Sequence, residues 1–114
     1  MVVIQHPAPA SERRQSLRRQ PTVGTVCRLT ADSGASPGTG LVWNISTHGI
    51  SMLLHQGPPP GTTLSGDLQS GDGRASLAIL FRVAHVVRLQ TGDYILGGPF
   101  LHPLTPEEMQ PFLG

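Results

Sequence analysis

The chain has 114 residues, a length that fits a single small domain. Apolar residues make up 38% of it, which is enough for a small core, while 14 glycines and 11 prolines favour turns over long helices. A net charge of +1 and the lack of any long apolar run argue against bulk attraction to nucleic acid and against insertion into a membrane.

The chain is predicted to begin with a flexible tail and an arginine arm. Residues 1–11 contain two prolines, no apolar period and no feature of a signal peptide, so the domain is expected to span 12–114. Four of the eight arginines lie within 13–19, and the sequence has no lysine. An arginine fork can hold a phosphate or a guanine edge through two hydrogen bonds, and its plane can stack on a base. The cluster therefore indicates a compact anion-binding site.

Six strands separated by turn-forming loops are predicted after this arm. Period-two alternation between glycine- and proline-rich turns is typical of strands. The predicted ranges are 22–30, 39–47, 50–55, 62–69, 74–90 and 94–101. The fifth is the longest, and its odd positions form an apolar face from Leu77 through Phe81 and His85 to Leu89. Because a strand this long usually curves around a core, the predicted fold is all-β, a small six-stranded antiparallel barrel.

A short C-terminal helix is predicted to follow the last strand. Thr105 can cap it, and Pro106 is allowed at its first position. Glu107 and Glu108 then favour the positive end of the helix. At most about two turns fit before the chain ends, so the helix adds little to an otherwise all-β domain.

The segment 44–49, Asn-Ile-Ser-Thr-His-Gly, combines the end of a strand with a tight turn. Asn44 and Ser46 are two residues apart, so they are expected to point outward from the same face of the strand. Gly49 would permit a positive φ and therefore a sharp turn. The opposite face of the strand would carry core residues, namely Leu41, Trp43 and Ile45.

Neither an enzyme nor a metal site is expected. Ser46 and His48 are separated by a strand end and a turn, and no Gly-x-Ser-x-Gly elbow is present. His85 and Cys27 fall on the apolar side of their predicted strands, so each is interpreted as a core or rim residue and not as a catalytic one. A single cysteine allows no internal disulfide, and the histidines show no familiar zinc spacing.

Two motifs taken together resemble the PilZ family. The first is R-x-x-x-R before the first strand, here Arg14-Gln15-Ser16-Leu17-Arg18. The second is [D/N]-x-S-x-x-G farther along the chain, here Asn44-Ile45-Ser46-Thr47-His48-Gly49. The run 94–101 is similar to the terminal G-x-x-F strand of the family, and 105–113 to the start of its C-terminal helix. The resemblance covers roughly residues 12–113, and Pro99 in the last strand is a departure from it.

The resemblance implies a barrel that binds the second messenger cyclic di-GMP in the bacterial cytoplasm, with no further cofactor. Arg14 and Arg18 would clamp the phosphates and the guanine edges of the ligand. Asn44 and Ser46 would contact the other guanine and the nearby backbone, and Gly49 would form the turn that keeps this surface open. Binding would order the arginine arm on the barrel and create a surface for a separate effector protein.

Two alternatives stay open at this point. A PilZ-like adaptor could bind proteins without any nucleotide, although such members of the family usually lack the arginine motif. A nucleic-acid-binding small barrel would need an extended basic face and exposed aromatic side chains. Aromatic residues are only 4% of the chain and the net charge is +1, so cyclic di-GMP and an effector protein are the expected partners, and nucleic acid is not.

Overall fold

Seven strands and one short helix make up the part of the chain that the structure describes. The structure is a computed structural model that describes residues 21, 24–31, 34 and 36–113. The predicted tail and the arginine arm, with Arg14 and Arg18, lie outside these residues. The strands are β1 (Val26–Ala31), β2 (Gly38–Ile45), β3 (Gly49–Leu54), β4 (Thr63–Gln69), β5 (Ser76–Arg82), β6 (His85–Arg88) and β7 (Tyr94–Pro99). They are followed by α2 (Pro106–Met109) and a 3-10 turn, η1 (Gln110–Phe112).

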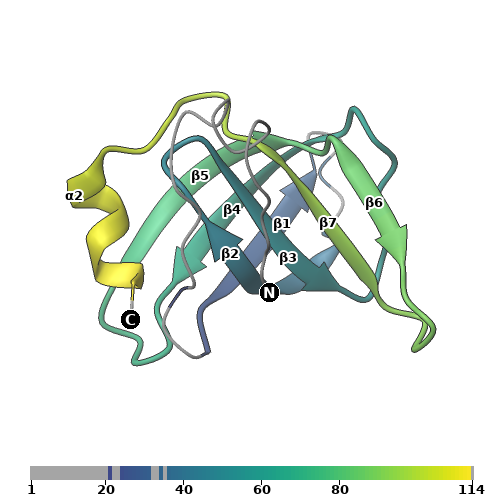
Figure 1. The fold of residues 1–114 in the computed structure, drawn as a ribbon, viewed down its shortest axis with the longest axis horizontal. Helices are drawn as coiled ribbons and strands as arrows, with labels where there is room; N and C mark the ends of the chain where they lie inside the picture. Colours follow the sequence, from purple (N-terminus) through teal and green to yellow (C-terminus); the bar gives the residue numbers. More distant parts are fainter. Residues whose placement is uncertain (1–20, 22–23, 32–33, 35, 114) are drawn as a thin grey trace, which may run out of the picture.

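All seven strands belong to one antiparallel sheet with the order β5-β4-β1-β2-β3-β7-β6. The sheet curls into a half-barrel, with α2 at one end of the curl (Figure 1). A bridge between Phe81 and Phe100, and a 2.9 Å hydrogen bond from the Leu101 N–H to the Leu80 carbonyl, join β5 to the chain just after β7. The predicted all-β class, the small antiparallel barrel and the short C-terminal helix are therefore confirmed.

The predicted strand 74–90 is divided into β5 and β6, which gives seven strands in place of the expected six. The N–H of Val83 donates to the Thr62 carbonyl at 2.9 Å, next to β4. The N–H of Ala84 donates to the Gly97 carbonyl at 2.8 Å, on β7. Between these two consecutive residues, the chain thus stops pairing with the β4 side and starts pairing with β7. This crossing is close, because a β-carbon on Gly98 would overlap the Arg82 carbonyl oxygen, so only glycine fits there.

The break also ends the apolar face that was predicted to run to Leu89. Phe81 and Val83 point into the core and are almost completely buried. His85 is exposed, and Val87 is 53% exposed. The expectation of one continuous apolar face beyond Val83 is therefore wrong, because the second half of the strand pairs with β7 alone and presents these side chains to the outside.

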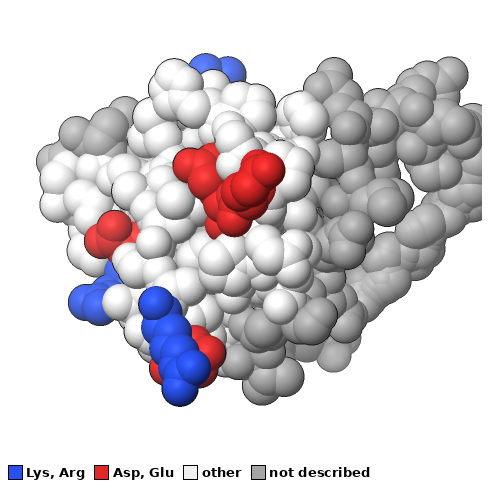
Figure 2. Space-filling view, turned by 90° about the vertical axis from the view of Figure 1, so that its left-hand side faces the viewer, with Lys and Arg blue, Asp and Glu red and all other residues white. Residues whose placement is uncertain are grey.

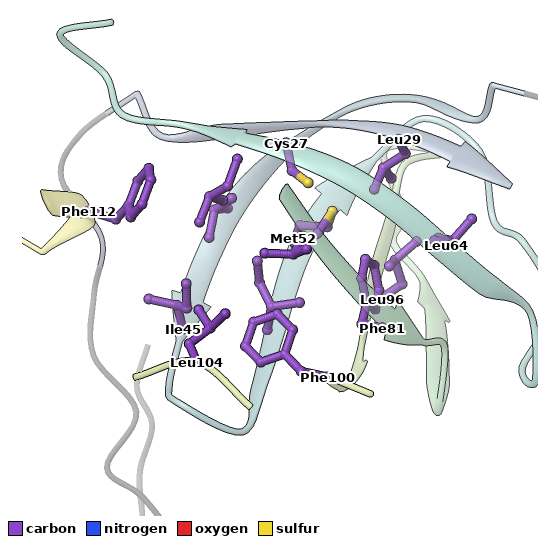
Figure 3. Packing of buried hydrophobic residues seen from close by; sticks show 14 of the residues in the cluster. Cys27, Leu29, Ile45, Met52, Leu64, Phe81, Leu96, Phe100, Leu104 and Phe112 are labelled. Carbon is purple, nitrogen blue, oxygen red and sulfur yellow. The ribbon is translucent and has the colours of Figure 1, made fainter. Parts of the chain in front are cut away.

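The core fills the concave side of the curled sheet. Figure 3 shows side chains from the strands meeting Leu104 and Phe112 of the C-terminal segment. Cys27 is fully buried in this cluster, as its parity predicted. Burial raises the pKa of its thiol to about 12, with the negative charge of Asp67 as a smaller cause, so the thiol stays protonated and acts as a small apolar packing group.

The C-terminal helix has the cap that the sequence predicted. The Thr105 hydroxyl accepts a hydrogen bond from the Glu108 N–H at 3.0 Å, and the Glu108 carboxylate accepts one from the Thr105 N–H at 2.9 Å. Met109 and Phe112 are buried. The cap therefore starts a helix that is too short to be stable alone but is held by the apolar residues that it delivers to the core.

Candidate functional site

A β-bulge at Trp43 decides what β2 presents to the outside. Val42 pairs with Met52, but Asn44 pairs with Ser51, so two residues of β2 stand opposite one residue of β3. The alternation of inward and outward side chains shifts by one residue at this point. Val42 before the bulge and Ile45 after it are both buried.

Because of the bulge, part of the core prediction for β2 is wrong. Leu41 is 43% exposed and Trp43 is 45% exposed, whereas both were expected inside with Ile45. Ile45 is fully buried, as predicted. The prediction failed because simple alternation has no way to represent one extra residue in a strand.

Asn44 lies on the outer side of the sheet, as predicted. Its amide oxygen accepts a hydrogen bond of 3.0 Å from the hydroxyl of Ser51, its cross-strand neighbour. The two N–H groups of the same amide have no hydrogen-bond partner among the described residues. The amide is therefore held in place at one end and offers hydrogen-bonding capacity at the other.

Ser46 is not an outward residue but part of the turn between β2 and β3. It is only 7% exposed, so its predicted outward orientation is wrong. Its hydroxyl accepts hydrogen bonds from the backbone N–H groups of His48 and Gly49, each at 3.1 Å. Its own N–H donates to the Gly49 carbonyl at 2.9 Å, which closes the turn. The strand ends at Ile45. The buried hydroxyl of Ser46 then accepts the hydrogen bonds of two backbone N–H groups of the turn.

The C-terminal segment clamps the same turn from the other side. The carbonyl of His48 accepts a hydrogen bond from the Phe100 N–H, and that of Thr47 accepts one from the Leu104 N–H, both at 2.8 Å. The turn is therefore fixed by its own serine and by two backbone bonds to a distant segment. A rigid turn of this kind can hold a recognition surface in one geometry.

Gly49 is required for a different reason from the one predicted. The glycines with positive φ among the described residues do not include Gly49, so the expected left-handed turn is wrong. A β-carbon at Gly49 would lie 2.9 Å from the carbonyl oxygen of Gly98 on β7. A side chain at position 49 would be costly, because the Gly98 carbonyl belongs to the backbone of β7 and cannot move away. Glycine therefore allows β3 and β7 to lie close together at the start of β3.

Ser46→Ala should lower the free energy of unfolding by about 1 to 3 kcal/mol, because two backbone N–H groups lose their acceptor in a buried turn. Urea unfolding followed by circular dichroism would measure the change. Ser65→Ala is the matched control, because Ser65 is exposed and donates a single 3.3 Å hydrogen bond to the Thr30 carbonyl. Equal effects of the two substitutions would show that Ser46 does not hold the turn.

The chain enters the described barrel beside the Asn44 end of β2. The Val42 N–H donates to the Thr25 carbonyl at 2.9 Å, which extends the pairing of β1 and β2 beyond Val26. Farther upstream, Pro21 forms a bridge with Leu113 of the C-terminal segment. Thr25 is thus fixed two positions from Asn44 along β2, whereas Pro21, the described residue nearest the arm, is fixed beside Leu113.

An apolar row crosses the outer face of the sheet over five strands. This outer apolar row, in register order from β1 to β6, consists of Val26, Leu41, Leu53, Ile95 and Val87. On β4 and β5 the same row continues with the polar residues Gln69 and Ser76. The outer apolar row therefore includes β2, the strand that carries Asn44 and Trp43, and does not extend to β4 and β5.

Charged groups are sparse on the described surface. Figure 2 looks onto the α2 side and shows an acidic patch on a largely uncharged surface, with basic side chains only at its margin. The acidic residues of α2 are Glu107 and Glu108, both exposed. Among the described residues, no group of three or more His, Cys, Asp or Glu side chains is placed to hold a metal ion. None of the helices within the described ranges is long and apolar enough to cross a bilayer.

Comparison with known proteins supports a PilZ-like fold. No protein-family model matches the chain, and no curated sequence matches it. Among solved structures, the PilZ domain with c-di-GMP of YcgR from Escherichia coli is similar, with a TM-score of 0.64 at 14% identity over 88% of this chain and 86% of that one. The Bacillus subtilis inhibitor of motility MotI/DgrA is similar with a TM-score of 0.59 at 15% identity, over 89% of this chain and 48% of that one. At these identities the likeness concerns the fold.

Proposed function

We propose that this protein is a bacterial, cytoplasmic receptor for cyclic di-GMP that acts on a separate effector protein. The proposal is supported by the PilZ-like fold, by the two sequence motifs, and by the positions of Asn44 and of the chain entry. One structural neighbour is a PilZ domain with c-di-GMP. In this proposal Arg14 and Arg18 bind the ligand together with Asn44, while Ser46 and Gly49 shape the turn beside it.

The entry of the chain next to β2 is the observation that carries the proposal. Thr25 is bonded to Val42, two residues before Asn44. Pro21, the described residue nearest the arm, is bridged to Leu113, and Arg18 and Arg14 precede it by three and seven residues. Chain of these lengths spans at most about 11 Å and 25 Å when extended. The described part of the domain is 37 × 32 × 26 Å, and in this proposal the arm crosses from the bridge to the outer face around Asn44.

The chemistry of the ligand fits the residues of this site. Cyclic di-GMP carries two phosphates and two guanines, and the guanine edge offers the O6 and N7 acceptors and the N2 donor. Arginine forks match phosphates and the O6/N7 edge through paired hydrogen bonds. The N–H groups of Asn44 that have no described partner can donate to the second guanine. Ser46 contributes through the backbone that it holds, because its hydroxyl oxygen already accepts hydrogen bonds from the N–H groups of His48 and Gly49.

The output of the receptor would be an ordered arm. Ligand that bridges the arginines to the barrel fixes the segment before Pro21 against the outer face, and the combined surface is then offered to the effector. Amide hydrogen exchange at residues 11–20 should slow when cyclic di-GMP is added, because ordered amides exchange less.

A protein-binding adaptor without nucleotide is the second candidate, and one specific observation favours it. The outer apolar row runs over five strands and includes Leu41 and Val87, which are 43% and 53% exposed. Contiguous apolar surface of this kind often marks a protein interaction site. A nucleic-acid-binding barrel is less well supported, since the net charge of the chain is only +1 and the described surface on the α2 side in Figure 2 shows no extended basic area.

Calorimetric titration with cyclic di-GMP, beside a single-stranded oligonucleotide, separates these functions. The receptor is expected to bind cyclic di-GMP and not the oligonucleotide, and the adaptor would bind neither. Asn44→Ala should weaken binding by about 1 kcal/mol through the lost hydrogen bond to guanine. Gln69→Ala, which removes an amide from β4 on the same face, is the matched control and should bind normally. Equal binding by Asn44→Ala and the wild type would remove Asn44 from the site.

A further inference from the structure

Trp43 is an exposed aromatic side chain beside the proposed nucleotide site. It is the only tryptophan in the chain and is 45% exposed. Large aromatic side chains contribute most when they are buried, so exposure of this size leaves much apolar surface in water. Nothing in the roles assigned to Arg14, Arg18, Asn44, Ser46 and Gly49 accounts for an indole at this position.

The bulge in β2 brings the indole and the Asn44 amide to the same side of the sheet. In a regular strand, residues 43 and 44 would point to opposite faces. Here both stand opposite Ser51, which bonds the Asn44 amide, and the buried residues on either side are Val42 and Ile45. Trp43 and Asn44 therefore form a neighbouring pair on the outer face, one a flat apolar surface and the other a hydrogen-bonding group.

Such a pair matches the two ways in which a protein recognises an exposed base. An aromatic ring supports the flat face of the base by stacking, which any base accepts. A side-chain amide then reads the edge of the same base by hydrogen bonding. A guanine in contact with Asn44 lies within reach of the adjacent indole, because consecutive Cα atoms are about 3.8 Å apart.

We propose that Trp43 is the stacking platform for the guanine that Asn44 contacts, so that cyclic di-GMP binds with one base flat on this indole. This inference rests on the proposed function and adds a residue to its site. The bulge is the structural device that makes it possible, because it keeps Asn44 on the outer face directly after Trp43, where regular alternation would have turned one of the two inward. Trp43 therefore contributes affinity for a purine face, and the arginines contribute affinity for phosphate and for base edges.

Intrinsic fluorescence tests the contact directly, because Trp43 is the only indole in the protein. Cyclic di-GMP added to the wild-type chain should change the emission of Trp43 and protect it from acrylamide. Calorimetry then compares three variants of the full chain. Trp43→Leu should bind about tenfold or more weakly, since a stacked base is lost, whereas Trp43→Phe keeps a ring and should lose less. Val87→Ala, on β6 of the same outer face, should bind like the wild type.

The outcomes separate this inference from the function on which it rests. Absence of any calorimetric binding by the wild type overturns the proposed function, and the platform with it. Normal binding by Trp43→Leu, with no change in wild-type fluorescence at saturating ligand, overturns the platform alone and leaves the proposed function standing. The fluorescence of the wild type decides the question even where a variant does not fold.

Discussion

Arg14→Ala and Arg18→Ala are each expected to weaken cyclic di-GMP binding by more than about 1.5 kcal/mol, or roughly tenfold, since each removes hydrogen bonds between charged groups. These are among the largest binding effects expected for single substitutions in this chain. The ligand carries two phosphates, and the described face around Asn44 supplies an amide and an indole but no arginine side chain within the segment 41–49. In the proposed function, the positive charge of the site comes from the arm. Isothermal titration calorimetry at fixed ionic strength would measure the loss.

Arg88→Ala is the matched control for these two variants. Arg88 is an exposed arginine at the end of β6, so its removal changes the net charge of the protein by the same amount. It should leave binding nearly unchanged. Arg14→Lys and Arg18→Lys add a second control, because lysine keeps the charge but loses the planar fork, and both should bind less tightly than arginine. The assignment of the site fails if the alanine variants of the arm bind like the wild type.

Phe81→Ala is expected to lower the free energy of unfolding by about 3 to 5 kcal/mol, the usual range for deletion of a buried aromatic ring. Phe81 is fully buried and pairs with Leu64 on β4. It also forms the bridge with Phe100 that joins β5 to the chain after β7. The substitution therefore removes core packing at the place where the sheet closes on itself. Because domains are stable by only about 5 to 15 kcal/mol, it should leave a marginal fold.

Chemical unfolding of Phe81→Ala is best compared with that of Leu80→Ala. Leu80 is the preceding residue on β5, is only partly buried, and points to the opposite face of the sheet. Its loss should cost about 1 kcal/mol or less, as is usual for a partly exposed position. Similar losses for the two variants would show that the centre of the core is not at Phe81.

Local patterns were sufficient for the strands and for the helix cap. Leu64, Phe81 and Leu96 were placed in strands by alternation, and all three are fully buried. Thr105 and Glu108 form the expected cap because capping is decided within four residues of the chain. The interruption at Val83 and Ala84 could not be predicted in this way, because it depends on a hydrogen bond from Ala84 to Gly97, a residue of another strand.

The turn at 44–49 was predicted from the sequence, but its geometry was not. The pattern Asn-x-Ser-x-x-Gly drew attention to the correct turn, yet it implied two outward side chains and a left-handed glycine. The structure has one outward amide at Asn44, one buried serine at Ser46, and a Gly49 that is required by the backbone of β7. Trp43 was placed in the core and lies outside it. The signal that could have found Trp43 is its position directly before Asn44, near the end of the strand.

The sequence by itself determined the all-β class, the antiparallel pairing through short turns and the capped helix, and it contained the two candidate motifs at 14–18 and 44–49. These follow from side-chain period, turn chemistry and capping, which act over a few residues. Only the tertiary structure decided which side of β2 faces outward at Trp43 and why Gly49 must be glycine. Both depend on partners on other strands, Ser51 on β3 across the bulge and Gly98 on β7, and packing against such partners overrides the local pattern.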